Sequence, residues 1–246
     1  MTKEYFYNKL REEFKRLIEL NGLNAQTVSV GCRLLSPNEA IGITERKDFP
    51  ILTGKEIMLS AELQGELGQA FTDAPSAGKA SLSEIINADI LENQHDLSVF
   101  IASLNAVMKK LGLTDRTVHC KNDEPEICAG KISDYIKSCY GNPKIALIGY
   151  QPAMLEKLSG DFSVRVLDLN DENIGEKRYG VTVENGIDAY ASAVEWADLI
   201  LCTGSTVCNG SIVNFIDIGK EVLFFGTTLS GAARLMNLKR ICFCAH

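Results

Sequence analysis

The sequence predicts an α/β protein in which a parallel sheet, covered by helices on both faces, follows a smaller α+β domain. From Lys144 onward, short apolar runs alternate with segments of helix length, which is typical of a parallel sheet. Residues 198–210 begin as an apolar run of buried-strand length and break into small polar residues, the usual construction of a ligand-facing edge. We place the domain boundary near residue 115, so the domains are 1–115 and 116–246, with 116–143 as connector and helix.

Composition narrows the class of protein. The 246 residues are 46% hydrophobic and 23% charged, as in ordinary globular proteins. A net charge of -7 without any Lys/Arg-rich run argues against a nucleic-acid partner. No apolar run approaches membrane-spanning length and the N-terminus has no apolar signal region, so we expect a cytoplasmic protein that does not bind membranes. The eight cysteines are then expected to be thiols or metal ligands.

The first part of the chain predicts helices around strand-like runs. Residues 3–20 carry an apolar stripe of helical spacing that Asn21-Gly22 ends. The runs 27–35 and 39–44 predict a hairpin through Ser36-Pro37-Asn38, and no element is assigned around residues 63–71. A capping box starts a short helix after Ser81.

A longer helix is predicted over residues 97–111, with Asn105 beside its apolar seam. This amide either bonds a neighbouring backbone group or faces a cleft, and we favour the structural role. A further helix is predicted over residues 131–140. Strands are expected at 144–148, 163–169, 199–202, 221–225 and 240–244, with a further short one at 182–183.

Ligands of such sheets bind outside the carboxyl ends of the strands. The residues delivered there are rich in hydroxyls, amides and glycines, which suit an anionic oxygen. Helix capping is the competing explanation for several of them. The predicted ligand-binding residues are Gly149, Tyr150, Gln151, Asp168, Asn170, Thr203, Gly204, Ser205, Thr206, Asn209, Gly226, Thr227 and Thr228.

Binding of NAD in its usual mode is not expected. Asp168 follows Gly149 by 19 residues, near the spacing of a ribose-binding carboxylate. However, Tyr150, Gln151 and Pro152 stand where the glycine fingerprint would need small residues.

The cysteines suggest a second theme. Cys208 lies on the candidate edge near a helix start, where a thiol can become a metal ligand, so it is our metal candidate. Core packing is expected for Cys32, Cys139 and Cys202. Cys242, Cys244 and His246 alternate and would share one face if the last strand continued to the chain end. We expect no tightly held stoichiometric zinc, because four ligands in close geometry are not evident.

The run Thr-Gly-Ser-Thr-x-x-Asn-Gly over residues 203–210 resembles the signature of a Rossmann-like domain family labelled putative heavy-metal chelation. Residues 144–152 (KIALIGYQP) and 222–231 (VLFFGTTLSG) fit further strand-turn units of that family. Residues 1–112 are similar to the enolase N-terminal-like domain that precedes it in many members. The resemblance implies a site between the two domains and a link to metal or metal-chelate handling.

We therefore expect binding, with processing left open, of a small anionic or metal-chelating ligand in the cleft between the domains. In this hypothesis the segments 203–206 and 226–228 hold oxygens, Asn209 and Gln151 orient the ligand, and Asp168 or Asn170 accepts from it. The alternatives are a non-catalytic sensor that signals by domain movement, and an enzyme that acts on a nucleotide-like substrate. Whether the chain is an enzyme, and whether it forms a homodimer, stays open.

Overall fold

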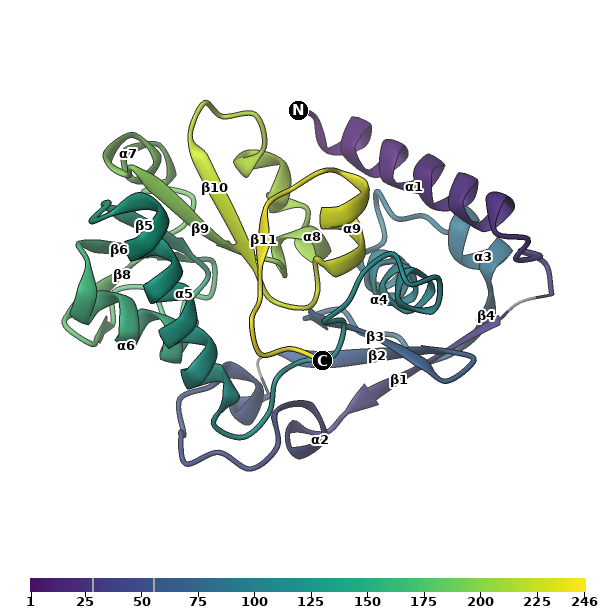
Figure 1. Cartoon of the computed structure of the whole chain (residues 1–246), viewed down its shortest axis with the longest axis horizontal. Coiled ribbons are helices and arrows are strands. Elements are labelled where there is room, and N and C mark those ends of the chain that lie inside the picture. The colour runs from purple at the N-terminus through teal and green to yellow at the C-terminus, as the bar shows by residue number, and fades with distance from the viewer. Residues whose placement is uncertain (28, 55) are drawn as a thin grey trace.

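The computed structural model describes residues 1–27, 29–54 and 56–246, and the elements within them build two separate sheets (Figure 1). The described residues include no helix that is both long enough and apolar enough to cross a membrane. The predicted α/β class is confirmed, because a parallel sheet covered by helices accounts for the second half of the chain.

The first sheet is antiparallel and has the order β3-β2-β1-β4. Its strands are β1 (Ser29–Leu35), β2 (Ile57–Leu63), β3 (Glu66–Thr72) and β4 (Gly78–Ser81). The unassigned stretch around residues 63–71 is the β2–β3 hairpin, whose turn contains Gln64 and Gly65 at positive φ. A Gly in the left-handed region is what such a tight turn favours.

The predicted second strand of residues 39–44 is wrong. Residues Pro37–Ile41 form helix α2 instead. The Ser36 hydroxyl accepts from the Glu39 N–H, and the Glu39 carboxylate accepts from the Ser36 N–H. This capping box, with Pro37 in the first turn, satisfies the backbone donors of a helix start and outweighs the β propensity of the run.

Three predicted helices of the first half are confirmed: α1 (Lys3–Leu20), α3 (Leu82–Asn87) and α4 (Gln94–Lys110). Helix α4 lies against β3 and β2 and is buried on almost every side. Gly68 of β3 permits this close approach, since a Cβ there would collide with the backbone of α4 at Ala102 and Ala106. Any side chain at position 68 would therefore push the helix off the sheet.

The second sheet has the order β11-β10-β9-β5-β6-β8-β7 and is parallel except for β7. Chain order reverses around β5, which pairs with β6 on one side and β9 on the other, so the switch point of the sheet lies between β5 and β9. Its strands are β5 (Ile145–Ile148), β6 (Val164–Asp168), β7 (Lys177–Arg178), β8 (Val181–Asn185), β9 (Leu199–Thr203), β10 (Glu221–Phe225) and β11 (Arg240–Ile241).

Helices connect these strands, as the sequence predicts. They are α5 (Glu124–Tyr140), α6 (Pro152–Asp161), α7 (Tyr190–Trp196), α8 (Thr206–Asn209) and α9 (Ser230–Leu235), with short 3-10 turns η1 (Pro50–Thr53) and η2 (Ser211–Phe215). Two boundaries differ from expectation. Helix α5 begins near Pro125 rather than at residue 131, since a proline in the first turn costs no hydrogen bond. Strand β11 ends at Ile241, so the predicted strand through Cys244 is wrong.

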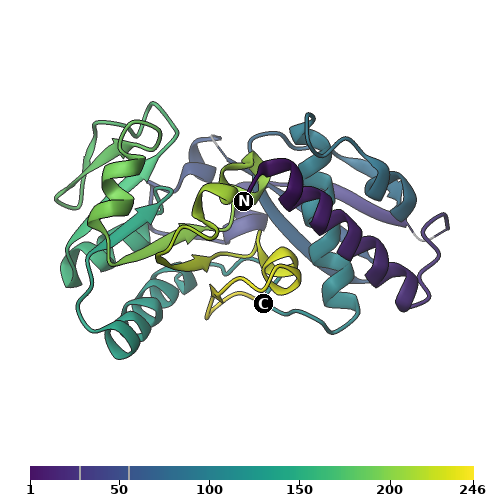
Figure 2. The ribbon, with the colours of Figure 1, turned by 90° about the horizontal axis from the view of Figure 1, so that it is seen from above.

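The two halves share one hydrophobic core. Helix α4 also contacts α8 and α9, and a single cluster of buried side chains includes Phe100 and Leu104 of the first half with Val207 and Leu229 of the second. The buried Tyr7 hydroxyl donates to the carbonyl of Val207 at 2.6 Å. Figure 2 shows the two sheets at either end of the molecule with α9 and the C-terminus between them. The boundary near residue 115 and the enolase N-terminal-like first domain stay predictions.

Candidate ligand cavity

A cavity of about 790 Å³ opens at the carboxyl ends of β5, β6, β9 and β10, at the switch point of the parallel sheet. Its volume is in the range of small-molecule sites. The first half closes it with Ile41, Phe49 and Phe71, so both halves contribute walls. The position agrees with the rule that ligands of open α/β sheets bind beside a reversal of strand order.

Every predicted ligand-binding residue except Thr227 lines this cavity, and Cys208 does too. Thr227 is buried behind the wall, and its hydroxyl has no hydrogen-bond partner in the described part of the chain. The topology thus brings together four turns that are far apart in sequence. The assignment of these side chains as ligand contacts stays a prediction.

The turn after β9 contributes hydroxyls to the cavity lining, and together with Thr228 they form what we call the hydroxyl wall, defined as Thr203, Ser205 and Thr228. The hydroxyls of Thr203 and Ser205 lie 3.0 Å apart and share a hydrogen bond. The Thr206 hydroxyl donates to the Thr203 carbonyl at 2.7 Å and so closes the turn. Helix α8 then runs for only four residues, so its macrodipole contributes little here.

Gly204 has a structural role in this turn. A Cβ at position 204 would lie 2.9 Å from the Cβ of Leu229 and 3.0 Å from the carbonyl oxygen of Phe225. The absence of a side chain therefore lets the turn pack against the chain after β10. Gly149 is constrained as well, because its φ is 86° and an added Cβ would lie 2.6 Å from the Thr203 side chain.

Several predicted ligand contacts hold turns together. Asp168 accepts from the N–H groups of Tyr150 and Asn170, each at 2.7 Å. Gln151 caps α6 by accepting from the Met154 N–H. Asn209 accepts from the Ser211 N–H at 3.0 Å. These bonds are what the capping explanation predicts.

Three acidic residues form a second group at the cavity, which we call the acidic wall and define as Glu56, Asp73 and Asp168. All three residues line the cavity. Burial, followed by the charges of Asp168 and Asp73, raises the pKa of Glu56 to about 7. Sequence reasoning missed Glu56 and Asp73, because the first directly precedes β2 and the second directly follows β3, two strands that were not predicted. The β2–β3 register, which pairs Ile57 with Thr72, brings them together.

His119 is a third residue that the sequence did not assign to the site. It lines the cavity, and its ring packs edge-on against Phe71 with centroids 5.1 Å apart. Burial lowers its pKa to about 4, so the imidazole is neutral near pH 7. With Nδ1 donating to the Cys120 carbonyl at 2.6 Å, Nε2 is left as an acceptor.

The burial of the cysteines differs in part from the prediction. Cys32 and Cys202 are buried as expected, but Cys139 is exposed, so its predicted core role is wrong. Cys208 is buried, and burial raises the pKa of its thiol, which opposes its role as a metal ligand. No group of three or more His, Cys, Asp or Glu side chains among residues 1–27, 29–54 and 56–246 is placed to hold a metal ion.

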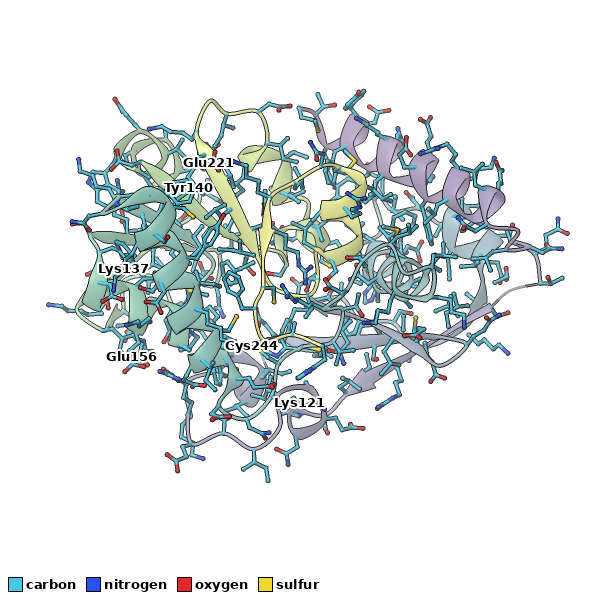
Figure 3. All side chains as sticks on the ribbon, viewed as in Figure 1. Lys121, Lys137, Tyr140, Glu156, Glu221 and Cys244 are labelled. Atoms are coloured by element: carbon cyan, nitrogen blue, oxygen red, sulfur yellow. The ribbon has the colours of Figure 1, made fainter. Side chains whose placement is uncertain are left out.

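Arg46 holds the segment before η1, which carries cavity-lining residues, against the second half of the chain. Its guanidinium bonds Glu126 of α5 at 2.7 Å and the Tyr179 hydroxyl at 2.7 Å, and it also pairs with Glu156 of α6, which is labelled in Figure 3. The Phe49 ring lies 5.8 Å from the guanidinium carbon. Arg46 therefore ties the segment that carries Phe49 and Ile51 to the second half of the chain.

The fold and the cavity place the chain among α/β proteins with a parallel sheet and a pocket at its switch point. Residues 133–238 match the model of the DUF364 family, described as "Putative heavy-metal chelation". The resemblance expected from residues 144–152, 203–210 and 222–231 is thereby confirmed over this part of the chain. A search of curated proteins found no match.

Two solved structures are similar to the chain. A DUF364 protein of unknown function from Pyrococcus horikoshii aligns with a TM-score of 0.54 at 18% identity and covers 89% of this chain and 79% of its own. A DUF364 protein of unknown function from Desulfitobacterium hafniense aligns with a TM-score of 0.48 at 12% identity and covers 73% of this chain and 72% of its own. The first supports the fold and carries no evidence on the ligand.

Proposed function

We propose that the cavity binds a small metal chelate, that is, an anionic oxygen-rich molecule together with its cation. The observation that carries the proposal is that two unlike groups line the same cavity, the hydroxyls of Thr203, Ser205 and Thr228 and the carboxyls of Glu56, Asp73 and Asp168. A ligand that has both anionic oxygens and a positive centre complements both walls.

The hydroxyl wall suits the oxygens of the chelator. The Thr203–Ser205 pair uses one of its two hydroxyl protons for the bond between them. The second proton is free to be donated to a ligand oxygen, and a donated bond to an anion is stronger than one between neutral groups.

The acidic wall suits the cation. Burial, and then the charges of Asp168 and Asp73, raise the pKa of Glu56 to about 7, so about half of these side chains carry a proton at pH 7. An arriving positive charge would offset that repulsion, and Glu56 would ionise. Binding is therefore expected to release a proton and to strengthen as pH rises through about 7.

The chelator is part of the proposal because the site does not fit a bare ion. The described residues offer no three-ligand group, and the Cys208 thiol stays protonated. A cation held by its own chelator has most of its coordination positions filled and needs only charge complementarity from the wall.

Equilibrium dialysis tests the proposal with three probes: Co²⁺ alone, citrate alone, and the Co²⁺–citrate complex. We expect only the complex to bind, and Glu56→Gln to weaken it by about tenfold, the value of one charge-assisted interaction. Glu62→Gln is the matched control, because Glu62 is exposed on β2, the strand that Glu56 directly precedes, and does not line the cavity. Binding of bare Co²⁺ or bare citrate as tightly as the complex would exclude the proposal.

A further inference from the structure

Two large apolar side chains stay exposed at the open edge of the cavity. Leu169 directly follows β6 and is 52% exposed, and Ile187 lies just after β8 and is 77% exposed. Among the exposed large apolar residues in the described part of the chain, only these two line the cavity. Single exposed apolar residues are common on protein surfaces, but two together beside a polar site indicate a surface that something covers.

The loops that carry Leu169 and Ile187 are adjacent, because β6 and β8 are neighbouring parallel strands (Figure 1). A Cβ added at Gly186, the residue before Ile187, would lie 3.2 Å from Cδ2 of Leu169. The Gly186 N–H also donates to the Asp168 carbonyl at 2.8 Å. The two apolar side chains are therefore presented at one edge, directly beside Asp168 of the acidic wall.

Tight turns hold both loops in place. The Asp168 carboxylate accepts from the Asn170 N–H at 2.7 Å. The Asn185 side chain accepts from the Ile187 N–H at 2.8 Å. Such bonds from a side chain to a nearby backbone group fix a turn without using the apolar side chains for packing. Leu169 and Ile187 are thus held in position before anything binds, which lowers the entropic cost of covering them.

The ring of Tyr190 adds to this apolar surface. Tyr190 begins α7 three residues after Ile187, and it also lines the cavity. Its hydroxyl donates to the Asn214 carbonyl at 2.5 Å, and its ring meets the Phe215 ring edge-on with centroids 5.7 Å apart. Because the hydroxyl already has a partner, the part of Tyr190 that remains for a ligand is its ring. We call Leu169, Ile187 and Tyr190 the apolar lip.

The apolar lip differs from the other apolar residues that line the cavity. Phe49, Ile51 and Met154 are only 6%, 4% and 3% exposed, because they belong to a hydrophobic cluster that includes side chains of α5 and α6. The fold has already removed their surface from water. The lip is apolar surface that the fold leaves in water, so a ligand that covers it gains hydrophobic free energy there.

We propose that the ligand is an amphiphilic chelator, whose oxygen-rich head binds at the hydroxyl and acidic walls and whose hydrocarbon substituent covers the apolar lip. The inference rests on the proposed function for the head and adds the chemical class of the chelator. Two observations favour a ligand over a second protein as the occupant. The lip is continuous with the cavity through Asp168 and Leu169, and a cavity of about 790 Å³ is of the size that holds ligands larger than citrate.

Two Co²⁺ complexes that differ only in a hydrocarbon chain test the proposal, the malonate complex and the butylmalonate complex. In equilibrium dialysis we expect the parent chain to bind the butylmalonate complex about tenfold more tightly, because part of the butyl chain leaves water. In the double variant Leu169→Ser, Ile187→Ser, the ratio of the two affinities should fall to near one. Ile43→Ser is the matched control and should keep the ratio, because Ile43 is 84% exposed and does not line the cavity. All three positions are exposed, so the variants are expected to fold.

A probe without metal separates failure of this proposal from failure of the proposed function. The fluorescent aryl anion anilinonaphthalene sulfonate should bind the parent chain and Ile43→Ser alike, and the double variant about fivefold more weakly. If neither Co²⁺ complex binds while the probe shows this difference, the proposed function is wrong and the apolar lip remains a ligand surface.

Three results would overturn the proposal. The first is equal affinity of the parent chain for the two Co²⁺ complexes, which would leave the proposed function intact. The second is equal affinity of the fluorescent probe for the parent chain and the double variant. The third is a parent chain that sediments as a dimer and a double variant that sediments as a monomer, because the lip would then be an interface between two copies of the chain.

Discussion

The two halves of the chain meet around helix α4 and around the cavity. Within the described residues, a buried amide has hydrogen-bond partners at the first contact, whereas two carboxyls lack them at the second. In the contact around α4, Asn105 is fully buried, donates to the carbonyls of Gln69 and Thr228 at 3.0 Å, and accepts from the Gly231 N–H at 2.7 Å. Around the cavity, the Glu56 and Asp73 carboxylates have no hydrogen bond or ion pair within the described ranges.

The difference separates a polar group that holds the fold from one that is available to a ligand. An amide with all its partners in place stabilises the packing and offers nothing to bind. Carboxyls that repel one another cost stability, and a complementary charge recovers that cost. The Asn105 contact thus joins the first half of the chain to the second.

The largest expected effect comes from removing the buried amide. Asn105→Ala leaves the Gly231 N–H and two carbonyls without their partner, so we expect the free energy of unfolding to fall by about 2–4 kcal/mol. Urea unfolding measures it. Asn87→Ala, an exposed amide that bonds its own helix, should cost under about 0.5 kcal/mol. Equal losses in the two variants would mean that Asn105 does not join the halves.

Glu56 gives a smaller effect that depends on pH. Its folded pKa of about 7 lies above the ordinary value of 4.5, so the native state of the parent chain loses stability as pH rises between these values. Glu56→Gln keeps the neutral form, so it should be more stable than the parent at pH 8, on the order of 2 kcal/mol after allowance for partial exposure. Thermal unfolding at pH 4 and pH 8 checks this, and a difference independent of pH would contradict the raised pKa.

Arg46 tests the rim of the cavity. Arg46→Ala removes its bonds to Glu126, Glu156 and Tyr179 at a half-buried position, and we expect a loss of about 1–2 kcal/mol. Proteolysis should then cut first within residues 42–54, because the rim segment opens. Arg16→Ala, which breaks an exposed pair with Glu13, should change neither stability nor the first cut.

The smallest effect concerns the hydroxyl wall. Ser205→Ala removes one donor of the Thr203–Ser205 pair and should weaken chelate binding by on the order of 1 kcal/mol, roughly fivefold, with stability unchanged. Calorimetric titration with Co²⁺–citrate measures this, and Ser138→Ala on the exposed face of α5 is the control. If Ser205→Ala binds like the parent, the pair serves only the turn.

The sequence predicted more of the strands of the second sheet than of the first. Strands β5, β6, β9 and β10 are short, largely apolar runs, whose length and spacing are visible in the sequence, and their topology gathered almost all the predicted residues at one edge. The acidic wall was not visible, because only the β2–β3 pairing sets Glu56 beside Asp73.

The glycines show a further limit. From the sequence, Gly204 was predicted to contact the ligand. In the structure, the absence of a side chain at this position is needed for the turn to pack against Leu229. A variant such as Gly204→Val would therefore disturb the fold before it reported on binding. Local sequence identifies a position that tolerates no side chain, but it does not identify what lies against it.

Native mass spectrometry of the chain, purified without metal-affinity chromatography, tests the central claim that the cavity holds a small chelate. We predict a non-covalent adduct whose organic part and metal leave together on dialysis, with the adduct absent from Ser205→Phe, which places a ring in the cavity where the chelator oxygens are proposed to bind. The adduct should be retained by Ser138→Phe, which adds the same ring to an exposed position of α5. Metal that survives dialysis against a chelator, or an adduct that persists in Ser205→Phe, would contradict the account.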